Sequence, residues 1–442
     1  MTQPNTTQQF VNWFRSSSPY IHAHRGRTFV ILFGGEAVED AGFPNLIHDI
    51  ALLNSLGVRL VLVHGARPQI ARQLAALGLE SRFEAGCRIT DKASLPGVEQ
   101  AVGQVRMNIE ARLSMGLPNT PMSGAKLRVV SGNFVTARPY GIRNGVDFCY
   151  TGEVRKIDVA AIHQHLQQSN VVLLSPVGYS PTGEIFNLRA EEVATATAAS
   201  LKADKLIILM ENNGVTDASG QFIAQLNLGE AERWLQQQGP TIDDDTQRHL
   251  ASAVGACKAG VGRAHLVSRQ ADGALLLELY TRDGRGTLIT AELYEGVRPA
   301  TIDDVGGILE LIKPLEEQGV LARRSREQLE LEIERFTVID RDGMIIACAA
   351  LYPFAEEQAG ELACLAVHPD YRQQGRADTL LAHIENQAKT QNLDKLLILT
   401  THTTHWFLER GFAEEPLEAL PVARRRLYNY QRNSKVLGKT LL

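Results

Sequence analysis

Apolar and polar residues alternate along the chain in blocks that predict an α/β fold. Short, uninterrupted apolar runs are separated by longer segments whose apolar residues recur at helical spacing. Strands this apolar are buried on both faces, which is typical of a mainly parallel sheet covered by helices. In the first half of the chain we expect such strands at Phe29–Phe33, Leu60–Val63, Val171–Leu174 and Leu206–Met210, with a smaller β addition at 129–136.

A short amphipathic helix is expected before the first strand, over residues 9–22. One side of it carries Phe10, Val11, Trp13 and Phe14, with Pro19 after it.

The α/β rhythm ends near residue 295, and a new unit opens there. Thr301 is a plausible helix N-cap, with Asp304 at the position of a capping box. Two helices, three strands (336–340, 344–352, 361–367), a helix, a strand (396–400), a helix and a strand follow. The expected domains are an arm (1–27), an α/β domain (28–290), a linker (291–297) and a second α/β domain (298–442).

Composition narrows the function classes. The chain has 442 residues, so more than one domain is expected, and its net charge of −5 argues against a nucleic-acid or anionic-membrane partner. Five cysteines lack CxxC spacing, which argues against a zinc site and a disulfide framework. With no evident signal peptide and no apolar run of membrane-spanning length, we expect a cytoplasmic protein.

The most informative motif lies at residues 362–385, where an apolar run, a basic turn and an amphipathic helix follow one another. A helix N-terminus attracts anions, and Gly375 lets the backbone approach one closely. Arg372 and Arg376 are expected to supply mobile positive charge. The spacing Arg372-x-x-Gly375-x-Ala377 resembles the pyrophosphate-binding signature of the GNAT acyl-CoA-dependent N-acetyltransferases; the alternative is an ordinary surface turn. The resemblance implies an acetyl-CoA site formed by Val367, Arg372, Gln373, Gln374, Gly375, Arg376 and Ala377.

Three further segments resemble the bacterial N-acetylglutamate synthase family: Arg323–Leu329, Tyr352–Phe354 and Tyr428–Leu437. The GNAT resemblance extends over about residues 298–436. It implies acetyl transfer from acetyl-CoA to L-glutamate, the first step of arginine biosynthesis, with no metal required.

Acetyl transfer needs a base for the amine and a donor for the oxyanion. Glu361 can take the amine proton directly or through a water; the alternative is a solvated charge at a strand end. A backbone N–H near Cys364 to Ala366 is the expected oxyanion donor. Cys364 itself is assigned to packing rather than to nucleophilic attack, because it lies in an apolar strand.

The tyrosine that usually protonates the leaving thiolate in this family is absent from residues 405–412. Thr400 is the best hydroxyl substitute, and a solvent proton would also suffice.

Two carboxylates on the substrate call for arginine forks. Arg324 and Arg432, with Ser434, are the candidates for glutamate binding. Arg323 and Arg326 are expected to face solvent or an interface, and the helix at 424–426 is expected to be a solvated face.

Residues 28–290 resemble the amino-acid kinase fold, most closely N-acetylglutamate kinase, through segments 30–35, 63–70, 186–192 and 203–208. Phosphoryl transfer needs cations and close backbone approach. Here Leu32 replaces one lysine, Ala66 and Arg67 replace two glycines of the acceptor loop, and Asp245–His249 lacks the second lysine. The resemblance therefore predicts a kinase fold without kinase chemistry, in a three-layer α/β sandwich.

The segment from His265 to Thr287 resembles the arginine-sensing signature of arginine-inhibited acetylglutamate kinases. It implies an allosteric L-arginine site at Tyr20, His265, Glu278 and Gly284, and feedback inhibition by L-arginine. A salt-bridged glutamate, a hairpin turn and a covering helix are the alternatives. By resemblance the N-terminal helix interlocks subunits, so a homo-oligomer is expected, with a hexamer as one candidate.

Two rival functions remain at this point. One is an active carboxylate kinase with an accessory acetyltransferase, against which Leu32 and the missing late lysine argue. The other is an arginine-binding regulatory protein with a vestigial GNAT unit, against which the intact turn at Arg372–Ala377 argues.

Overall fold

A computed structural model describes residues 6–116, 118–212, 214–217, 219–238, 243–290, 295–372 and 375–441. The chain divides into two compact units, Met1–Glu292 and Leu293–Leu442. Among the described residues, no helix is both long enough and apolar enough to cross a membrane.

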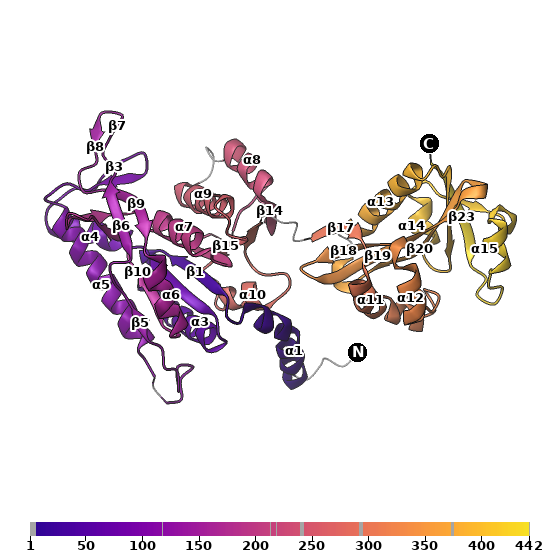
Figure 1. Ribbon diagram of the computed structural model, residues 1–442, viewed down its shortest axis with the longest axis horizontal. Coiled ribbons are helices and arrows are strands. Elements are labelled where there is room, and N and C mark those ends of the chain that lie inside the picture. Colours follow the sequence, from indigo (N-terminus) through magenta and orange to yellow (C-terminus); the bar gives the residue numbers. More distant parts are fainter. Residues whose placement is uncertain are drawn as a thin grey trace. The chain divides into compact units, whose positions relative to one another are not determined.

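The N-terminal unit is built around a mainly parallel sheet (Figure 1). In the described residues this sheet has eight strands in the order β14-β16-β15-β13-β1-β2-β10-β5, and only the β15–β16 pair is antiparallel. Its strands are β1 (Thr28–Phe33), β2 (Arg59–His64), β5 (Val129–Val130), β10 (Val171–Leu174), β13 (Lys205–Met210), β14 (Gln225–Asn227), β15 (Arg263–Ser268) and β16 (Thr287–Thr290).

Helices cover both faces of this sheet, as the apolar runs predict. Along β1, Val30 and Leu32 join one core cluster, whereas Phe29, Ile31 and Phe33 join the other. Because successive strand residues point to opposite faces, a wholly apolar strand needs a cover on each side. The covering helices are α2 (Gly35–Glu39), α3 (Phe43–Ser55), α4 (Arg67–Ala76), α5 (Leu95–Leu113), α6 (Val159–Gln167), α7 (Ala190–Leu201), α8 (Leu228–Gln238), α9 (Asp244–Lys258) and α10 (Ala274–Tyr280).

A smaller sheet joins β6 (Val135–Pro139), β9 (Gly152–Ile157), β11 (Val177–Tyr179) and β12 (Ile185–Asn187). Two hairpins complete the unit, β3 (Arg82–Glu84) with β4 (Cys87–Ile89) and β7 (Ile142–Arg143) with β8 (Val146–Asp147). The first helix, α1 (Thr6–His24), is longer than expected, and Pro19 lies inside it rather than after it. A proline inside a helix removes one backbone hydrogen bond and its ring crowds the carbonyl four residues earlier, which bends or ends a helix; here the helix continues to His24.

The C-terminal unit has a seven-stranded sheet in its described residues, in the order β17-β18-β19-β20-β21-β23-β22. Its strands are β17 (Glu295–Pro299), β18 (Phe336–Arg341), β19 (Met344–Phe354), β20 (Ala359–Val367), β21 (Lys395–Thr400), β22 (Ala413–Glu415) and β23 (Lys435–Thr440). Helices α11 (Val305–Glu317) and α12 (Arg326–Glu332) cover one face, and α13 (Arg376–Thr390) covers the other (Figure 1). Two short helices, α14 (Thr404–Leu408) and α15 (Val422–Arg426), complete it.

The start of this unit differs from the expectation in one respect. Residues 295–297, expected to be linker, form the first part of β17, which pairs with β18. Residues 291–294 of that linker lie outside the described residues. The capping box of Thr301 and Asp304 is confirmed, and Arg298 donates to both oxygens of Asp304 at 2.7 and 2.8 Å.

Candidate active site

A large cavity of the C-terminal unit opens where β20 and β21 separate. The two strands pair from Ala359 with Lys395 to Glu361 with Leu397, and both then line a cavity of about 1330 Å³. Parallel strands that part leave backbone donors and acceptors without ladder partners on that side. A ligand between β20 and β21 can therefore bind main-chain groups as well as side chains.

A bulge in β20 reshapes the wall of this cavity. The register between β19 and β20 shifts near Cys348, and Cys364 adopts a φ of +54°. A bulge inserts an extra residue and redirects nearby groups. The Cys348 thiol donates to the Cys364 carbonyl over 3.5 Å, and both side chains are buried. The contact involves the main chain of Cys364, which also lines the cavity, so the packing role of its side chain stays a prediction. The bulge lies where the oxyanion donor is expected.

Glu361 is buried beside the point of separation, with 7% of its surface exposed. The Arg424 side chain donates to both of its oxygens, over 2.5 Å from Nε and 3.1 Å from Nη2. Glu361 is therefore not a solvated charge at a strand end. The expectation that the helix at 424–426 is only a solvated face is also wrong, because Arg424 points from α15 into the cavity wall.

Arg324, Arg432 and Ser434, the expected substrate residues, all line this cavity. Arg324 Nη1 donates to the Ala322 carbonyl over 3.2 Å, and Arg432 Nη2 donates to the carbonyls of Gly319, over 3.3 Å, and Val320. Burial and the nearby Arg324 charge lower the pKa of Arg432. In the described part of the chain neither guanidinium forms an ion pair, so the cavity holds cationic charge that an anionic ligand would neutralise.

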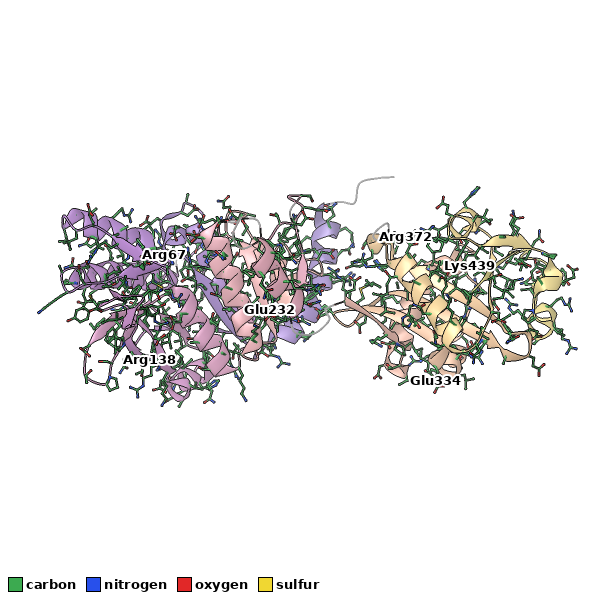
Figure 2. The ribbon with its side chains drawn as sticks, turned by 90° about the horizontal axis from the view of Figure 1, so that it is seen from above. Arg67, Arg138, Glu232, Glu334, Arg372 and Lys439 are labelled. Carbon is green, nitrogen blue, oxygen red and sulfur yellow. The ribbon has the colours of Figure 1, made fainter. Side chains whose placement is uncertain are left out.

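The basic turn also borders the cavity. Gly375, at a φ of +76°, is the N-cap residue of α13, and a side chain at that position would be strained. Arg372 is exposed on this turn and donates from Nε to the Val367 carbonyl over 3.3 Å (Figure 2). Gln373 and Gln374 lie outside the described residues. Val367, Arg376 and Ala377 line the cavity with Arg372 and Gly375.

Arg376 does not supply the mobile charge that was expected. Its Nε and Nη2 donate to the two oxygens of Glu295 over 2.7 and 2.8 Å, and its side chain is only 11% exposed. Burial works against the charged form of Glu295, but hydrogen bonds from Arg376 and Arg341 lower its pKa overall. Arg376 therefore fastens the start of α13 to β17.

Thr400 lies at the end of β21, on the cavity wall. Its hydroxyl lies 2.8 Å from the Thr403 hydroxyl and accepts the Thr403 backbone N–H over 3.0 Å. A third contact, from the His402 backbone N–H over 3.4 Å, also positions this hydroxyl. The aromatic residues Trp406 and Phe407 line the same wall.

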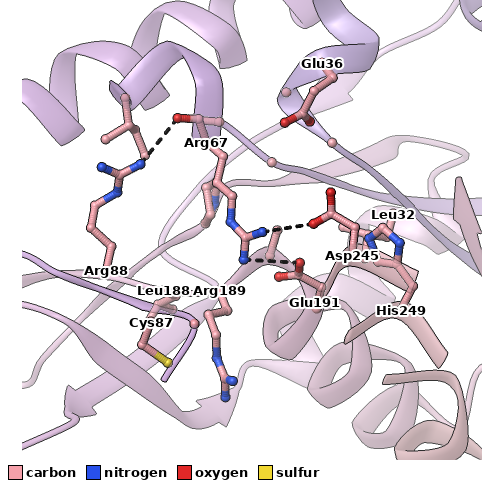
Figure 3. Close-up of a pocket in the computed structure, with 18 of the residues that line it drawn as sticks. Leu32, Glu36, Arg67, Cys87, Arg88, Leu188, Arg189, Glu191, Asp245 and His249 are labelled. Atoms are coloured by element: carbon pink, nitrogen blue, oxygen red, sulfur yellow. Dashed lines mark hydrogen bonds and ion pairs between the residues drawn. The ribbon is translucent and has the colours of Figure 1, made fainter. Parts of the chain in front are cut away.

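A second, smaller cavity of about 100 Å³ lies in the N-terminal unit, where the kinase resemblance places phosphoryl transfer (Figure 3). Arg67 points into it and pairs with Glu191 over 3.6 Å and Asp245 over 3.3 Å. Leu32 lines it with only 2% of its surface exposed. An apolar side chain and an internally neutralised arginine thus occupy positions where a phosphoryl group would need free cations.

Glu278 is the centre of a buried polar cluster between β15 and the turn after α10. Its Oε1 lies 2.6 Å from His265 Nδ1, and its Oε2 accepts the backbone N–H groups of Arg285 and Gly286 over 2.6 and 2.7 Å. Burial alone would raise the pKa of Glu278, but these hydrogen bonds lower it to about 2. Burial lowers the pKa of His265. Since Lys205 Nζ lies 3.3 Å from His265 Nε2 and only donates, Nε2 is the acceptor and Nδ1 carries the proton.

The other two residues of the expected arginine site are Gly284, which lies beside this cluster, and Tyr20, which lies on the helix that contacts α10. Gly284 leaves no room for a side chain, because a Cβ there would lie 2.4 Å from Glu278 Oε2. Tyr20 lies on α1, its ring centroid 6.3 Å from that of His24, whose Nε2 contacts the Leu279 carbonyl of α10 at 2.7 Å. The structure therefore brings His265, Glu278 and Gly284 together and holds α1 against the helix that carries Glu278.

Two residues with a direct part in the site were missed in the sequence. Arg424 stands in a run of three arginines, and no signal in the run distinguishes the residue that faces Glu361. Glu295 could not be predicted as a partner of Arg376, because residues 291–297 were expected to form a linker.

Comparison with known proteins gives the same two-part organisation. Residues 27–268 match the amino acid kinase family, and residues 307–412 match the acetyltransferase (GNAT) family. The chain is 55% identical over 432 residues to the amino-acid acetyltransferase of Ectopseudomonas mendocina, covering 98% of this chain and 99% of that protein. It is 56% identical over 434 residues to that of Azotobacter vinelandii, covering 98% and 100%.

Solved structures agree. N-acetylglutamate synthase from Neisseria gonorrhoeae, crystallised with coenzyme A and L-arginine, superimposes with a TM-score of 0.89 at 39% identity, covering 98% of this chain and 99% of that one. The same protein with coenzyme A and N-acetyl-glutamate gives 0.62 at 40% identity, with the same coverage. The chain therefore belongs to the amino-acid acetyltransferase (N-acetylglutamate synthase) family, acyltransferases that join an amino-acid-kinase-like domain to a GNAT domain.

Proposed function

We propose that this chain transfers the acetyl group of acetyl-CoA to the α-amino group of L-glutamate, giving N-acetyl-L-glutamate and coenzyme A. The observation that carries the proposal is a buried carboxylate, Glu361, in a cavity that also holds Arg324 and Arg432. The arginines suit a dicarboxylate, and the carboxylate suits an amine that must lose a proton. The ligands named for the Neisseria structures, coenzyme A and N-acetyl-glutamate, support the same pair of substrates.

The steps follow from the cavity wall. Glu361 takes a proton from the substrate ammonium, directly or through a water, and the free amine attacks the thioester carbonyl. The oxyanion that forms is stabilised by main-chain N–H groups at the β20 bulge near Cys364. When the carbon–sulfur bond breaks, the new amide nitrogen loses its second proton and the thiolate of coenzyme A gains one. The Thr400 hydroxyl can relay this proton, giving one to sulfur as it accepts the other, or solvent can carry it.

Acetyl-CoA is placed with its pyrophosphate at the N-terminus of α13. There the first-turn N–H groups and the Arg372 side chain offer donors and positive charge. Its pantetheine arm would then run between β20 and β21, where both strands line the cavity.

Release of free thiol from acetyl-CoA, measured with a panel of amino acids, tests the reaction. The full chain is expected to release thiol with glutamate and to form a product with the mass of N-acetylglutamate. Aspartate and glutamine serve as shorter and uncharged comparisons. Thiol release that does not depend on glutamate refutes the proposal.

We further propose that L-arginine binds at Glu278 and inhibits the enzyme. The buried Glu278 carboxylate can pair with a guanidinium, which would share it with the Arg285 and Gly286 N–H groups that it already accepts. Arginine is the end product of the pathway that begins with this reaction, and an inhibitor must couple the two domains by favouring one state of the enzyme. The arginine named for a Neisseria structure supports this site.

Calorimetric titration of the full chain with L-arginine tests the second proposal, with L-citrulline as the uncharged isostere. Arginine alone is expected to bind, and Glu278→Gln is expected to weaken its binding at least tenfold. Equal binding of citrulline, or unchanged binding by the variant, refutes it.

An oligomer is proposed on the exposed apolar side of α1. Phe10, Trp13 and Phe14 are 63, 43 and 55% exposed, and the rings of Phe10 and Phe14 stack 6.2 Å apart. A second copy of the chain would cover them. Light scattering is expected to give a mass above that of one chain, and Phe10→Ser with Phe14→Ser is expected to lower it.

A further inference from the structure

Arg424 lines the same cavity as Arg324 and Arg432, but its side chain binds a different kind of group. Arg324 and Arg432 donate to backbone carbonyls, whereas Arg424 grips the carboxylate of Glu361 with two hydrogen bonds. Its remaining contact is long, 3.4 Å from Nη1 to the Leu427 carbonyl. Any amine or water that approaches Glu361 must compete with this guanidinium.

The helix that carries Arg424 gives it freedom to move. α15 spans only Val422–Arg426, and none of its residues is buried. The Arg424 side chain is 24% exposed, against 9% for that of Glu361. The arginine is therefore the partner that can change position, while β20 fixes the carboxylate.

A side-chain carboxylate on the acceptor offers Arg424 the same chemical group that Glu361 offers. When the Arg424 guanidinium moves from one carboxylate to the other, it keeps two charge-assisted hydrogen bonds. The move therefore costs little interaction free energy. The exchange also prevents two carboxylates from facing each other without a cation between them.

We propose that Arg424 is a positioning and specificity-determining residue: it holds Glu361 in the empty site and moves to the side-chain carboxylate of the acceptor, which frees Glu361 for the ammonium group. The inference rests on the proposed acetyl transfer to glutamate. When the acceptor has no side-chain carboxylate, Arg424 stays on Glu361. Such an acceptor is acetylated slowly even when it binds.

Steady-state thiol release with glutamate and with glutamine tests this role in Arg424→Gln and Arg424→Lys. For glutamate, Arg424→Gln is expected to lower kcat/KM by 10- to 100-fold, about the effect of losing a hydrogen bond to a charged group. For glutamine, the same variant is expected to raise kcat several-fold, because Glu361 is no longer held. Arg424→Lys, which keeps the charge, is expected to retain the preference for glutamate.

Arg426→Gln is the matched control, since Arg426 is exposed on the same helix and does not line the cavity. Arg426→Gln is expected to leave kcat and kcat/KM unchanged with both glutamate and glutamine. If Arg424 has only a structural role, Arg424→Gln lowers the rates of acetylation of glutamate and glutamine by the same factor. That result overturns the role of Arg424 and leaves the proposed acetyl transfer standing. If the unaltered chain acetylates neither amino acid, the proposed function fails and the inference fails with it.

Discussion

Glu361 and Cys364 lie three positions apart on β20, yet their surroundings assign them different roles. Both line the cavity, but the Glu361 carboxylate accepts from a guanidinium, whereas the main-chain carbonyl of Cys364 accepts from the Cys348 thiol at the bulge. Direct acetyl transfer needs a proton acceptor and no covalent intermediate on the enzyme.

Glu361→Gln is therefore expected to lower kcat by about 10²- to 10⁴-fold, the usual contribution of a general base, with little change in the KM for acetyl-CoA. Cys364→Ala is expected to keep kcat within about tenfold of the unaltered chain. Steady-state thiol release measures both. Loss of all activity in Cys364→Ala, with an acetylated cysteine in the unaltered chain, would contradict direct transfer.

Glu278 makes the stability of the N-terminal unit depend on pH. Its pKa of about 2 lies below the ordinary glutamate value of 4.5, so its stabilising effect is complete above pH 4.5 and is lost as the pH falls toward 2. The effect is on the order of 3 kcal/mol at neutral pH, since each pKa unit corresponds to about 1.4 kcal/mol.

Glu278→Gln is expected to lower the free energy of unfolding by about this amount at pH 7 and by progressively less below pH 4.5. Urea unfolding of both chains at a series of pH values measures the difference. A difference that stays constant down to pH 3 would show that the Glu278 charge is not its cause.

The start of α13 separates two arginines that look alike in the sequence. Arg372 is exposed, whereas Arg376 is held by Glu295. Arg372→Ala is expected to raise the KM for acetyl-CoA by about 3- to 10-fold without changing the melting temperature. Arg376→Ala is expected to destabilise the C-terminal unit by about 2 kcal/mol, less than a fully buried pair because Arg341 still neutralises Glu295. Thermal unfolding and the KM for acetyl-CoA distinguish the two variants. Equal effects of both variants on the melting temperature and on the KM would contradict the different roles of Arg372 and Arg376.

The two ends of α10 offer a similar pair of glycines, Gly273 before the helix and Gly284 in the turn after it. Gly284 and Gly273 have φ angles of +60° and +70°, so alanine at either is strained by about 1–3 kcal/mol. Only at Gly284 would the new Cβ also collide with Glu278, at 2.4 Å from Oε2; at Gly273 nothing lies within 4 Å. Gly284→Ala is expected to abolish arginine binding by calorimetry, while Gly273→Ala retains it. Retained binding by Gly284→Ala would place the arginine elsewhere.

The strands could be predicted from the sequence because a strand buried on both faces must be apolar throughout. β1, β2, β10 and β13 lie within a residue or two of the expected positions, and the capping box at Thr301 is as expected. The ion pairs could not be predicted, because a periodic pattern shows which face a residue occupies and not which charge it meets. Arg424 and Glu361 are 63 positions apart, and Arg376 and Glu295 are 81 apart.

For the whole molecule, the two proposals place acetyl transfer and arginine binding in separate domains. The kinase-like domain has an arginine, Arg67, held by acidic residues where phosphoryl transfer needs free cations, and it retains a buried carboxylate at Glu278. The C-terminal domain holds the cavity that Glu361, the proposed base, lines together with Arg324 and Arg432. Regulation then requires that a ligand of the first domain changes the activity of the second.

Thiol release from acetyl-CoA by the full chain, measured with glutamate over a range of L-arginine concentrations and with L-citrulline as the control, tests this division of labour most directly. We predict glutamate-dependent release that arginine suppresses to a low plateau and citrulline leaves unchanged. Release that does not require glutamate, or equal suppression by arginine and citrulline, would contradict it.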